Sequence, residues 1–435
     1  MATDALLRRP LRVARLLSVE VPAAPIGLAE HLERHGPLRV APRRAGAEQL
    51  ALLDEIGRSG LTGRGGGGFP TAAKLTMIRQ AGGARLLIVN ATEGEPASAK
   101  DKTLLTYAPH LVLDGAEVVA GLIGATRALV ALDERDAPRR AALRVALGER
   151  AARHGVRVEI GAVAVPPGYV HGEESALSNF VLTGVALPFF RPDKSKPLQR
   201  RRQRTLVQNA ETLAHVALIA RHGAAWFATA GDKGASGSTL VTLSGSLAHP
   251  GVFEVALGHP LGDVVGLGAP TEALQAVLVG GYGGSWVGPG ALGAPYSKAG
   301  LGPHGAAPGA GVLLALGERH CGIAESARLA AYLARQGAGQ CGPCVFGLPA
   351  LAEDLGRLAR GDADAGTLER LERRLATIAG RGGCGHPDGA VRMVKSALSV
   401  FCEDVARHRA GQPCPWASAP SLLAPAALEG PGGGR

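Results

Sequence analysis

Aromatic residues and long apolar runs are scarce in this sequence, and no cysteine precedes residue 321. Only 4% of the 435 residues are aromatic, and no nucleic-acid-binding motif is present, so recognition by base stacking is not expected. The longest apolar stretches, such as residues 118–123, are far too short to span a bilayer. Residues 1–25 hold arginines but no apolar block followed by a small-residue cleavage site. We therefore expect a cytoplasmic protein that binds no nucleic acid and does not insert directly into a membrane.

The chain has an excess of positive charge, part of which is concentrated in one short segment. Its formal net charge is +10 with histidines neutral. Six basic residues lie within residues 194–204: Lys194, Lys196, Arg200, Arg201, Arg202 and Arg204. Such a segment is either a solvated loop or a docking patch for an acidic protein or an anionic ligand.

The cysteines gather in the last third of the chain, which favours a metal site over disulfides in a cytoplasmic protein. The six are Cys321, Cys341, Cys344, Cys384, Cys402 and Cys414. A Cys-x-x-Cys pair, Cys341 and Cys344, is followed at a distance by Cys384 and suits either zinc or an iron–sulfur cluster. No second Cys-x-x-Cys exists, which weakens the zinc-ribbon alternative. No βαβ pattern surrounds the pair, which argues against a thioredoxin-like redox site.

The order of periodic segments predicts several domains, and 46% hydrophobic residues can support their cores. Residues 1–48 look like an N-terminal extension with one short helix at 26–35. Between 49 and 234, helices alternate with apolar strands, which predicts an α/β domain with a largely parallel sheet. The expected helices are 47–59, 109–123 and 137–154, and the expected strands are 85–90, 128–132 and 156–160.

The second half of the chain changes character twice. Residues 235–320 predict a small α+β module with strands at 238–244, 251–255 and 276–279, a short helix at 263–265, and a long Gly/Pro-rich loop at 281–310. Residues 321–411 have helical periodicity at 323–335, 345–360, 367–379 and 390–408, which predicts a four-helix bundle. Residues 412–435 are rich in Pro, Ala and Gly and are expected to be disordered.

A glycine-rich loop is the most informative segment. Residues 63–74 read Gly-Arg-Gly-Gly-Gly-Gly-Phe-Pro-Thr-Ala-Ala-Lys. Glycines allow a ligand to approach the main chain, and backbone N–H groups before a helix N-terminus bind anions. Thr71 could cap that helix, and Lys74 would add a positive charge. The loop therefore predicts a site for a nucleotide or flavin phosphate; the alternative is a flexible surface loop.

Three further segments carry polar side chains suited to a ligand. Asn90 follows an expected strand, and Glu93 and Glu95 after it could accept hydrogen bonds from ribose hydroxyls or an amide; the alternative is an acidic turn. Residues 172–174 (Gly-Glu-Glu) precede an apolar helix, where capping is a real competitor. Asn209 could contact a phosphate or ring, or could cap the next helix.

Taken in order, these five segments resemble the NADH-binding flavoprotein subunit of respiratory complex I. That family also includes the equivalent subunits of NAD-reducing hydrogenases and formate dehydrogenases. The match covers roughly residues 45–410 and suggests a divergent paralogue, at the periphery of a membrane complex. The resemblance implies an FMN-binding α/β domain, a ubiquitin-like β-grasp module, and a four-helix bundle that holds a [4Fe–4S] cluster.

The resemblance also implies roles for individual residues. The FMN-binding set is Gly63, Arg64, Gly65, Gly66, Gly68, Lys74, Asn90, Glu93, Gly172, Glu173, Glu174 and Asn209. In this set the glycine loop and Lys74 hold the phosphate, and Gly172 to Glu174 line the flavin and nicotinamide site. Phe69 would stack on the NADH adenine and Glu95 would meet its ribose. The cluster ligands would be Cys341, Cys344 and Cys384.

The sequence also departs from the family pattern. Thr92 and Gln208 replace an aspartate and an asparagine, while Met77 and Lys194 stand where aromatic residues are expected near NADH. Ala338 replaces a cluster cysteine, so the fourth ligand could be His386, Cys321, Cys402 or solvent. Because about 17 residues of helix span roughly 25 Å, Cys321 is a poor candidate. Lys194 could favour NADPH.

The function expected from these features is electron transfer by a flavoprotein. NADH or NADPH would reduce FMN, and electrons would pass through the cluster to a protein acceptor. The acceptor would be a ferredoxin-like iron–sulfur protein or another component of a redox complex. Two alternatives remain open: a flavoprotein without nicotinamide activity that exchanges electrons with a ferredoxin-like partner at residues 194–204, and a non-catalytic scaffold protein.

Overall fold

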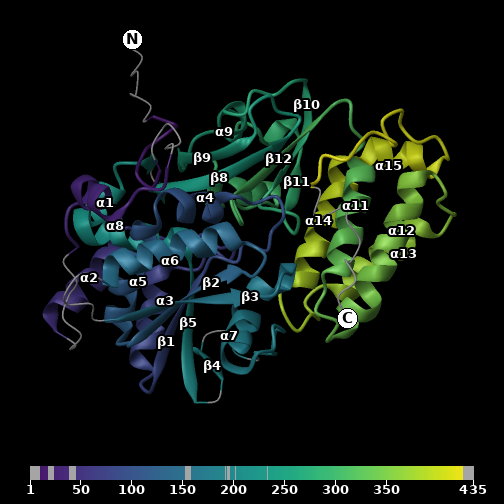
Figure 1. The fold of residues 1–435 in the computed structure, drawn as a ribbon. Helices are drawn as coiled ribbons and strands as arrows, with labels where there is room; N and C mark the ends of the chain where they lie inside the picture. Colours follow the sequence, from purple (N-terminus) through teal and green to yellow (C-terminus); the bar gives the residue numbers. More distant parts are fainter. Residues whose placement is uncertain are drawn as a thin grey trace, which may run out of the picture.

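A computed structural model describes residues 10–17, 24–38, 46–151, 158–191, 193, 196–200, 202–232 and 234–424. It contains two five-stranded sheets and a helical region. Figure 1 shows the first sheet and its helices below, the second sheet above, and the helical region on the right. Within the described residues, no helix is both long enough and apolar enough to cross a bilayer.

The first sheet is mainly parallel, as the alternation of helices and strands predicts. Its strands, in the spatial order β3-β2-β1-β5-β4, are β3 (Glu159–Val165), β2 (Arg127–Asp133), β1 (Arg85–Asn90), β5 (Gln203–Asn209) and β4 (Leu198–Arg200). Only the edge pair β4–β5 is antiparallel. The associated helices are α2 (Ala47–Arg58), α3 (Thr71–Gln80), α4 (Lys100–Tyr107), α5 (Pro109–Ile123), α6 (Ala137–Ala151), η1 (Tyr169–Gly172), α7 (Glu174–Thr183) and α8 (Ala210–Phe227).

Both faces of this sheet are buried, which explains the continuous apolar run of β1. Leu87 and Val89 belong to a core built with α3, α5 and α8. Ile88 points to the opposite face and packs in a second core with Leu177 of α7. Successive residues of a strand point to opposite faces, so a strand that is covered on both sides must be apolar throughout.

The strand order places a topological switch point between β1 and β5. The chain runs from β1 to β2 on one side, whereas β5 pairs with the other edge of β1. The two strands end together, because Asn90 is the register partner of Asn209. In open parallel sheets, ligands bind beyond the carboxyl ends of the strands at such a point.

The second sheet has the order β11-β10-β12-β8-β9. Its elements are β8 (Ser238–Gly245), β9 (Gly251–Ala256), α9 (Leu261–Gly266), β10 (Leu274–Val279), β11 (Ser285–Val287), α10 (Lys298–Leu301) and β12 (Val312–Gly317). Strand β12 lies in the centre, parallel to β8 and antiparallel to β10. The region expected to be a long loop therefore contains β11 and α10, and β12 follows it. The sequence does not predict these three elements, because short elements between Gly/Pro turns show no clear periodicity.

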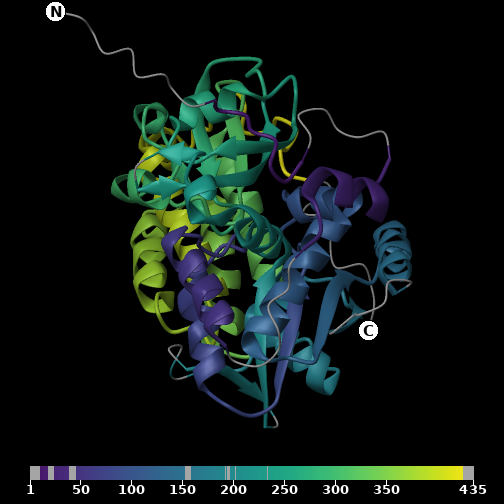
Figure 2. The same cartoon turned by 90° about the vertical axis from the view of Figure 1, so that its left-hand side faces the viewer.

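The described part of the N-terminal extension is attached to the rest of the protein. Arg12 forms a bridge with Val255 of β9, and Val13 N donates to Glu254 O at 3.2 Å. Helix α1 (Leu28–His35) follows, and its His31 Nε2 lies 2.7 Å from Asp114 Oδ2 of α5. Figure 2 shows the described parts of this segment in purple, with α1 beside the helices of the first sheet.

The helical region follows β12 and begins with α11 (Gly322–Arg335), and the fourth expected helix is divided into two. It continues with η4 (Pro343–Gly347), α12 (Leu348–Arg360), α13 (Thr367–Ile378), α14 (His386–Val400) and α15 (Cys402–Arg409). The helix expected over 390–408 is interrupted at Phe401. The Phe401 ring packs 5.3 Å from that of Trp286, and a Cβ on Gly322 would come within 2.4 Å of it. Burial of this ring against the second sheet accompanies the break.

The expectation that residues 412–435 are disordered is wrong for residues 412–424. Leu423 is buried, Ser421 Oγ donates to Glu325 Oε2 at 2.9 Å, and Ala424 N donates to the Tyr282 hydroxyl at 3.0 Å. Composition suggested disorder, but Leu423 and Cys414 join the core of the helical region. Residues 425–435 lie outside the described residues.

Candidate functional site

The glycine loop connects α2 to α3 and is closed at its base. Thr62 bridges Pro70, and Gly63 N donates to Phe69 O at 2.9 Å. Gly66 and Gly68 have φ values of 106° and 57°, a region that side-chain-bearing residues rarely adopt. A Cβ on Gly67 or Gly68 would meet no heavy atom within 4 Å. The loop is therefore anchored at its ends and open on its outer side.

Two contacts hold the loop against the carboxyl edge of the sheet. Arg64 N donates to Thr212 Oγ1 of α8 at 2.9 Å. A Cβ on Gly65 would lie 3.2 Å from Asn209 Cβ, so the loop approaches Asn209 closely. Phe69 is half-exposed beside the loop (51%). The sequence prediction that the loop and Asn209 belong to one site agrees with this geometry.

Asn90 and Gly172 meet at the end of β1. Asn90 Nδ2 donates to Gly172 O at 2.8 Å, and Thr92 Oγ1 donates to Asn90 Oδ1 at 2.8 Å. A Cβ on Gly172 would lie 2.7 Å from Thr92 Oγ1, so a side chain there would displace Thr92. The segments around residues 90 and 172 are thus brought together as expected.

The two acidic residues after Gly172 have different partners. Glu173 is the N-cap of α7 and accepts from Ser175 N at 2.9 Å, so the capping alternative is correct for it. Glu174 lies 3.1 Å from Lys74 Nζ, which also donates to Val207 O at 2.8 Å. The cation predicted for a phosphate is therefore present beside the loop, with its charge balanced by Glu174.

Asn209 also serves as a cap. Its Oδ1 accepts from Glu211 N at 3.1 Å at the start of α8, as the alternative interpretation required. Its Nδ2 donates to Asp101 Oδ2 at 2.6 Å, and Lys100 Nζ donates to its Oδ1 at 3.2 Å. These bonds fix the orientation of its amide.

The sequence prediction assigned no role to Lys100, Asp101 and Glu211, which form a buried charged cluster under the loop. Lys100 Nζ lies 2.9 Å from Asp101 Oδ1 and 3.0 Å from Glu211 Oε2. Burial disfavours the Lys100 charge, but the neighbouring carboxylates outweigh it and raise the Lys100 pKa. Burial raises the pKa of Asp101 to about 6 despite Lys100. The available signal was Glu211 in the apolar helix α8, because a charged residue is buried only when it is paired.

The two acids between β1 and α4 both accept hydrogen bonds, but from different parts of the fold. Glu93 accepts from Ser98 Oγ at 2.6 Å, Asp101 N at 3.0 Å and Lys102 N at 2.9 Å. Its carboxylate therefore holds the start of α4. Glu95 accepts from Tyr282 N at 2.9 Å, and burial raises its pKa to about 7.

The residues at this edge fit FMN. The open side of the glycine loop leaves room for a ligand, and Lys74 supplies a cation. Gln208, beside Asn209 at the end of β5, is buried, and no described residue pairs with its Nε2. A buried amide donor without a partner costs about 1–3 kcal/mol, which a ligand acceptor would recover.

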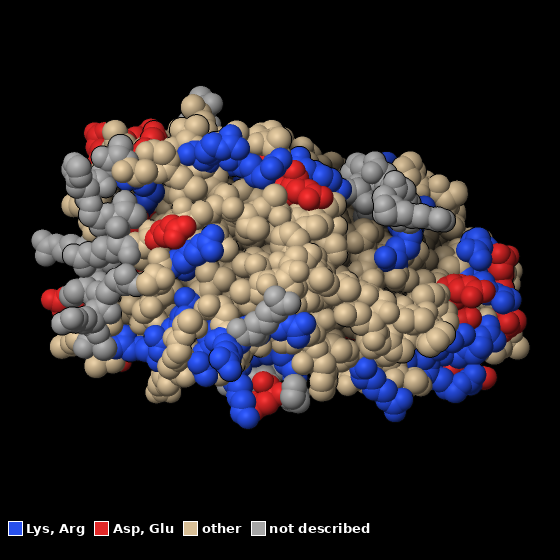
Figure 3. Space-filling model, turned by 60° about the horizontal axis from the view of Figure 1, so that its bottom comes forward, with Lys and Arg blue, Asp and Glu red and all other residues tan. Residues whose placement is uncertain are grey.

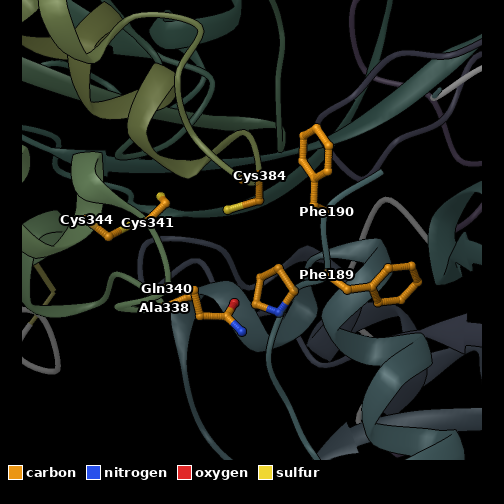
Figure 4. A pocket seen from close by; sticks show the side chains of 9 residues that line it. Phe189, Phe190, Ala338, Gln340, Cys341, Cys344 and Cys384 are labelled. Atoms are coloured by element: carbon orange, nitrogen blue, oxygen red, sulfur yellow. The ribbon is translucent and has the colours of Figure 1, made fainter. Parts of the chain in front are cut away.

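The predicted cluster cysteines line a hollow of about 310 Å³ between the helical region and the segment after α7. Its other lining residues are Pro188, Phe189, Phe190, Ala338, Gln340 and Gly383. Figure 4 shows the Cys384 side chain directed toward Cys341 across this hollow. Burial, with Cys341 and Cys384 nearby, raises the pKa of Cys344 to about 11. The three predicted ligands are thus gathered around one space.

None of the protein side chains considered as the fourth ligand lines the hollow. His386 Nε2 lies 2.8 Å from Leu333 O, with which it forms a hydrogen bond. Cys402 is exposed on α15. Cys321 caps the opposite end of α11 and lies beside His408 and Cys414. The structure therefore places none of the three protein candidates at the hollow.

The predicted basic segment is described only in part. Lys194 and Arg201 lie outside the described residues. Lys196 and Arg202 are at the surface near β4. Figure 3, which brings this lower side forward, shows more Lys and Arg than Asp and Glu around a largely uncharged area.

Known protein families match both of these regions of the chain. The family model described as the Nuo51 FMN-binding domain matches residues 56–218, and that of the NADH-ubiquinone oxidoreductase-F iron-sulfur binding region matches residues 324–408. The F subunit of the NADH-quinone oxidoreductase of Streptomyces coelicolor is 31% identical over 402 residues, 89% of each chain. This chain belongs to the family of NADH-quinone oxidoreductase F subunits. The Escherichia coli member is 27% identical over 87% of this chain and 89% of its own.

A solved structure extends this likeness to the fold. A chain of an NAD+-reducing [NiFe]-hydrogenase in the H2-reduced state superposes with a TM-score of 0.76 and 32% identity, covering 87% of this chain and 69% of its own. The glycine loop, Asn90, Gly172 and Asn209 fall in the first matched region, and Cys341, Cys344 and Cys384 in the second. Cys321 and Cys414 lie outside both.

Proposed function

We propose that this chain oxidises NADH or NADPH through bound FMN and passes the electrons through a [4Fe–4S] cluster to a protein partner. The observation that carries the proposal is the meeting of the glycine loop, Asn90, Gly172 and Asn209 at the β1/β5 switch point, inside the region matched by the FMN-binding model. When bound, FMN supplies hydride acceptance and one-electron release, and the cluster carries single electrons.

In this proposal the protein positions the cofactor and supplies charge. Backbone N–H groups of Gly63, Arg64, Gly65, Gly66 and Gly68 would face the FMN phosphate at the N-terminal end of α3. Lys74 would bind the phosphate. Its distance of 3.1 Å from Glu174 supports this role, because the ammonium is held in a fixed place beside the loop.

Residues at the carboxyl edge of the sheet would bind the isoalloxazine ring of the flavin. Asn90 and Asn209 are fixed by their own hydrogen bonds, so they would present amide atoms without reorganisation. Gly172 and Glu173 would border the flavin. Glu93, bound to three donors around α4, would act by holding the β1–α4 turn.

The nicotinamide nucleotide would bind next to the flavin, where Phe69 and Glu95 lie. Phe69 is exposed enough to stack on an adenine. Glu95, next to Tyr282, would accept from ribose hydroxyls. Met77 on α3 provides no aromatic ring. We therefore propose that Phe69 supplies the main stacking contact. We also propose that charged residues other than Glu95 decide whether NADH or NADPH binds.

The described residues divide into three proposed domains. We propose residues 49–234 as the FMN-binding domain, 235–320 as a β-grasp module and 321–411 as the cluster-binding helical bundle. The β-grasp proposal rests on two β-hairpins, β8–β9 and β10–β11, that flank a central strand β12 parallel to β8, with α9 between them. Cys341, Cys344 and Cys384 would bind three irons, and solvent would occupy the corner beside Ala338.

The partner would dock near the cluster. Phe190 at the hollow is 72% exposed, and Phe346 in η4 is 75% exposed. Exposed apolar side chains beside a basic surface fit an acidic ferredoxin-like protein or another component of a redox complex.

The decisive experiment is a visible spectrum of the full chain purified without oxygen. Flavin absorption that bleaches on addition of NADH or NADPH, with an electron paramagnetic resonance signal after reduction, is the expected result. A flavin that does not bleach with either nucleotide would favour the flavoprotein without nicotinamide activity. Protein that is colourless, free of iron and not reconstituted by FMN would leave only the scaffold alternative.

A further inference from the structure

Three buried side chains that can bind metal meet at the end of the helical region remote from the cluster hollow. Cys321 precedes α11, His408 lies on α15, and Cys414 follows α15 in the segment whose composition suggested disorder. Their exposed fractions are 2%, 0% and 8%. Within the described part of the chain, this is the one group of three or more potential ligands whose donor atoms lie within 4.8 Å of one another.

The spacing of these atoms suits one tetrahedral ion. Cys321 Sγ lies 3.4 Å from His408 Nε2. A sulfur at about 2.3 Å and a nitrogen at about 2.0 Å from the same zinc ion are about 3.5 Å apart in tetrahedral geometry. Cys321 and His408 would therefore bind an ion with little movement.

The histidine is oriented as a ligand. His408 Nδ1 lies 3.0 Å from Ala359 O and 3.2 Å from Leu358 O. Since carbonyl oxygens only accept, Nδ1 carries the proton and Nε2 carries the lone pair, which accepts from Cys414 N at 3.3 Å; a bound ion would replace this hydrogen bond. A ligating histidine usually donates its second ring N–H to a carbonyl in this way.

Cys321 lies at a helix N-terminus, although burial and the neighbouring Cys414 raise the pKa of its thiol. Its Sγ accepts from Ala324 N at 3.3 Å at the N-terminus of α11, a helix of 14 residues. Negative charge is stabilised at a helix N-terminus. Two soft sulfur donors and one imidazole prefer zinc to the hard cations calcium and magnesium.

We propose that Cys321, His408 and Cys414 bind one Zn²⁺, with solvent as the fourth ligand. Each thiol loses its proton when it binds, so the ion enters as two protons leave and no redox change occurs. This site is separate from the cluster, because α11 alone is about 21 Å long at 1.5 Å per residue. Its effect would be to fix the segment after α15 to the start of α11.

Metal analysis of the full chain tests the proposal. The wild-type protein, expressed with zinc and stripped of loosely bound metal, should hold about one zinc per chain in addition to iron. Cys414→Ser and His408→Gln should lose that zinc, whereas Cys402→Ser, which removes an exposed cysteine from the same helix as His408, should keep it. Cys341→Ser should lower iron and leave zinc unchanged, which separates this site from the cluster.

A spectroscopic measurement on the wild-type protein does not depend on how the variants fold. X-ray absorption at the zinc edge should show two sulfur neighbours at about 2.3 Å and nitrogen at about 2.0 Å. Substitution by Co²⁺ should produce thiolate-to-cobalt absorption. Absence of zinc from the wild type, zinc without sulfur neighbours, or a Cys321–Cys414 disulfide in protein prepared without oxygen would each overturn the proposal.

Discussion

Lys74 is the single residue on which the proposed phosphate site depends most. Its ammonium already lies 3.1 Å from Glu174 and donates to Val207 O, so it is oriented before any ligand arrives. Hydrogen bonds to charged groups contribute about 1.5–3 kcal/mol, or roughly 10- to 150-fold in affinity. We expect Lys74→Gln to weaken FMN binding by that factor, measured by flavin fluorescence during titration of the apoprotein.

Lys298→Gln is the matched control, because Lys298 is an exposed lysine on α10 in the second sheet's module. It should bind FMN like the wild type. Equal FMN affinity of the Lys74 variant and wild type would remove Lys74 from the phosphate site.

Glu95 predicts a pH dependence of nucleotide binding. Burial raises its pKa to about 7, so it is mostly protonated below pH 7 and mostly ionised above. Ribose hydroxyls donate to a carboxylate more strongly than to a carboxylic acid. If the ionised form alone binds well, the dissociation constant for NADH should rise about fivefold from pH 7 to pH 6 and level off near pH 8. Glu95→Gln should bind NADH weakly with a flat profile between pH 6 and 8; an unchanged slope in that variant would show that another group titrates.

Ala338 marks the corner of the hollow where the family has a cysteine. It lines the same space as Cys341, Cys344 and Cys384, so a thiol there is within reach of a fourth iron. We expect Ala338→Cys to raise the iron content and the stability of the cluster to air, followed by iron analysis and by loss of visible absorption with time. Ala365→Cys, which adds an exposed thiol between α12 and α13, should change neither; a rise in both variants would indicate non-specific iron binding.

At the scale of elements, the close approach between η1 and the end of β1 is testable by a pair of substitutions. A Cβ on Gly172 would lie 2.7 Å from Thr92 Oγ1, too close for an unchanged structure. Gly172→Ala should reduce FMN retention and the melting temperature. The double variant with Thr92→Ala removes the clashing hydroxyl and should recover part of both losses. Failure of the second substitution to restore anything would mean that the glycine is required for another reason, such as backbone conformation.

The sequence predicts the helices and strands whose buried residues follow a regular spacing. It does not predict those that are buried because distant parts of the fold pack against them. Strand β1 is predicted to the residue because it is apolar on both faces and is bounded by polar residues. Strand β12 is not predicted, although all of its residues are buried, because glycine and proline surround it. The division between α14 and α15 depends on where the Phe401 ring packs. The residues near Phe401 in the sequence do not predict this contact.

The candidate site shows the same limit. The glycines of the loop and the asparagines at strand ends can be predicted as site residues from the sequence. Their role depends on neighbouring residues in the chain and not on distant ones. In the sequence, the binding of Glu93 and Glu173 to N–H groups at a helix start cannot be distinguished from ligand binding, because both roles need an acceptor near backbone N–H groups. Cys321 and Cys414 are visible in the sequence, but their meeting with His408 depends on the path of the chain after α15.

At the scale of the whole molecule, residues 412–424 join parts that lie far apart in the sequence. Ala424 N donates to the Tyr282 hydroxyl, and Tyr282 N in turn donates to Glu95. This segment thus connects the helical region to the second sheet and, through Tyr282, to the proposed nucleotide site. Ser421 adds a hydrogen bond to Glu325 of α11.

Removing residues 412–424 should therefore destabilise the helical region and the proposed nucleotide site as well as the C-terminal segment. Truncation after Gly411 exposes the contacts of Leu423, whose burial contributes about 1.5–3 kcal/mol, and deletes Cys414. We expect a lower melting temperature, faster hydrogen exchange in α11 and α15, and weaker NADH binding through the loss of support for Tyr282. Truncation after Ala424 keeps every contact named here and is the matched control, expected to behave like the full chain. If both truncations match the full chain in melting temperature and exchange, residues 412–424 do not hold the helical region together.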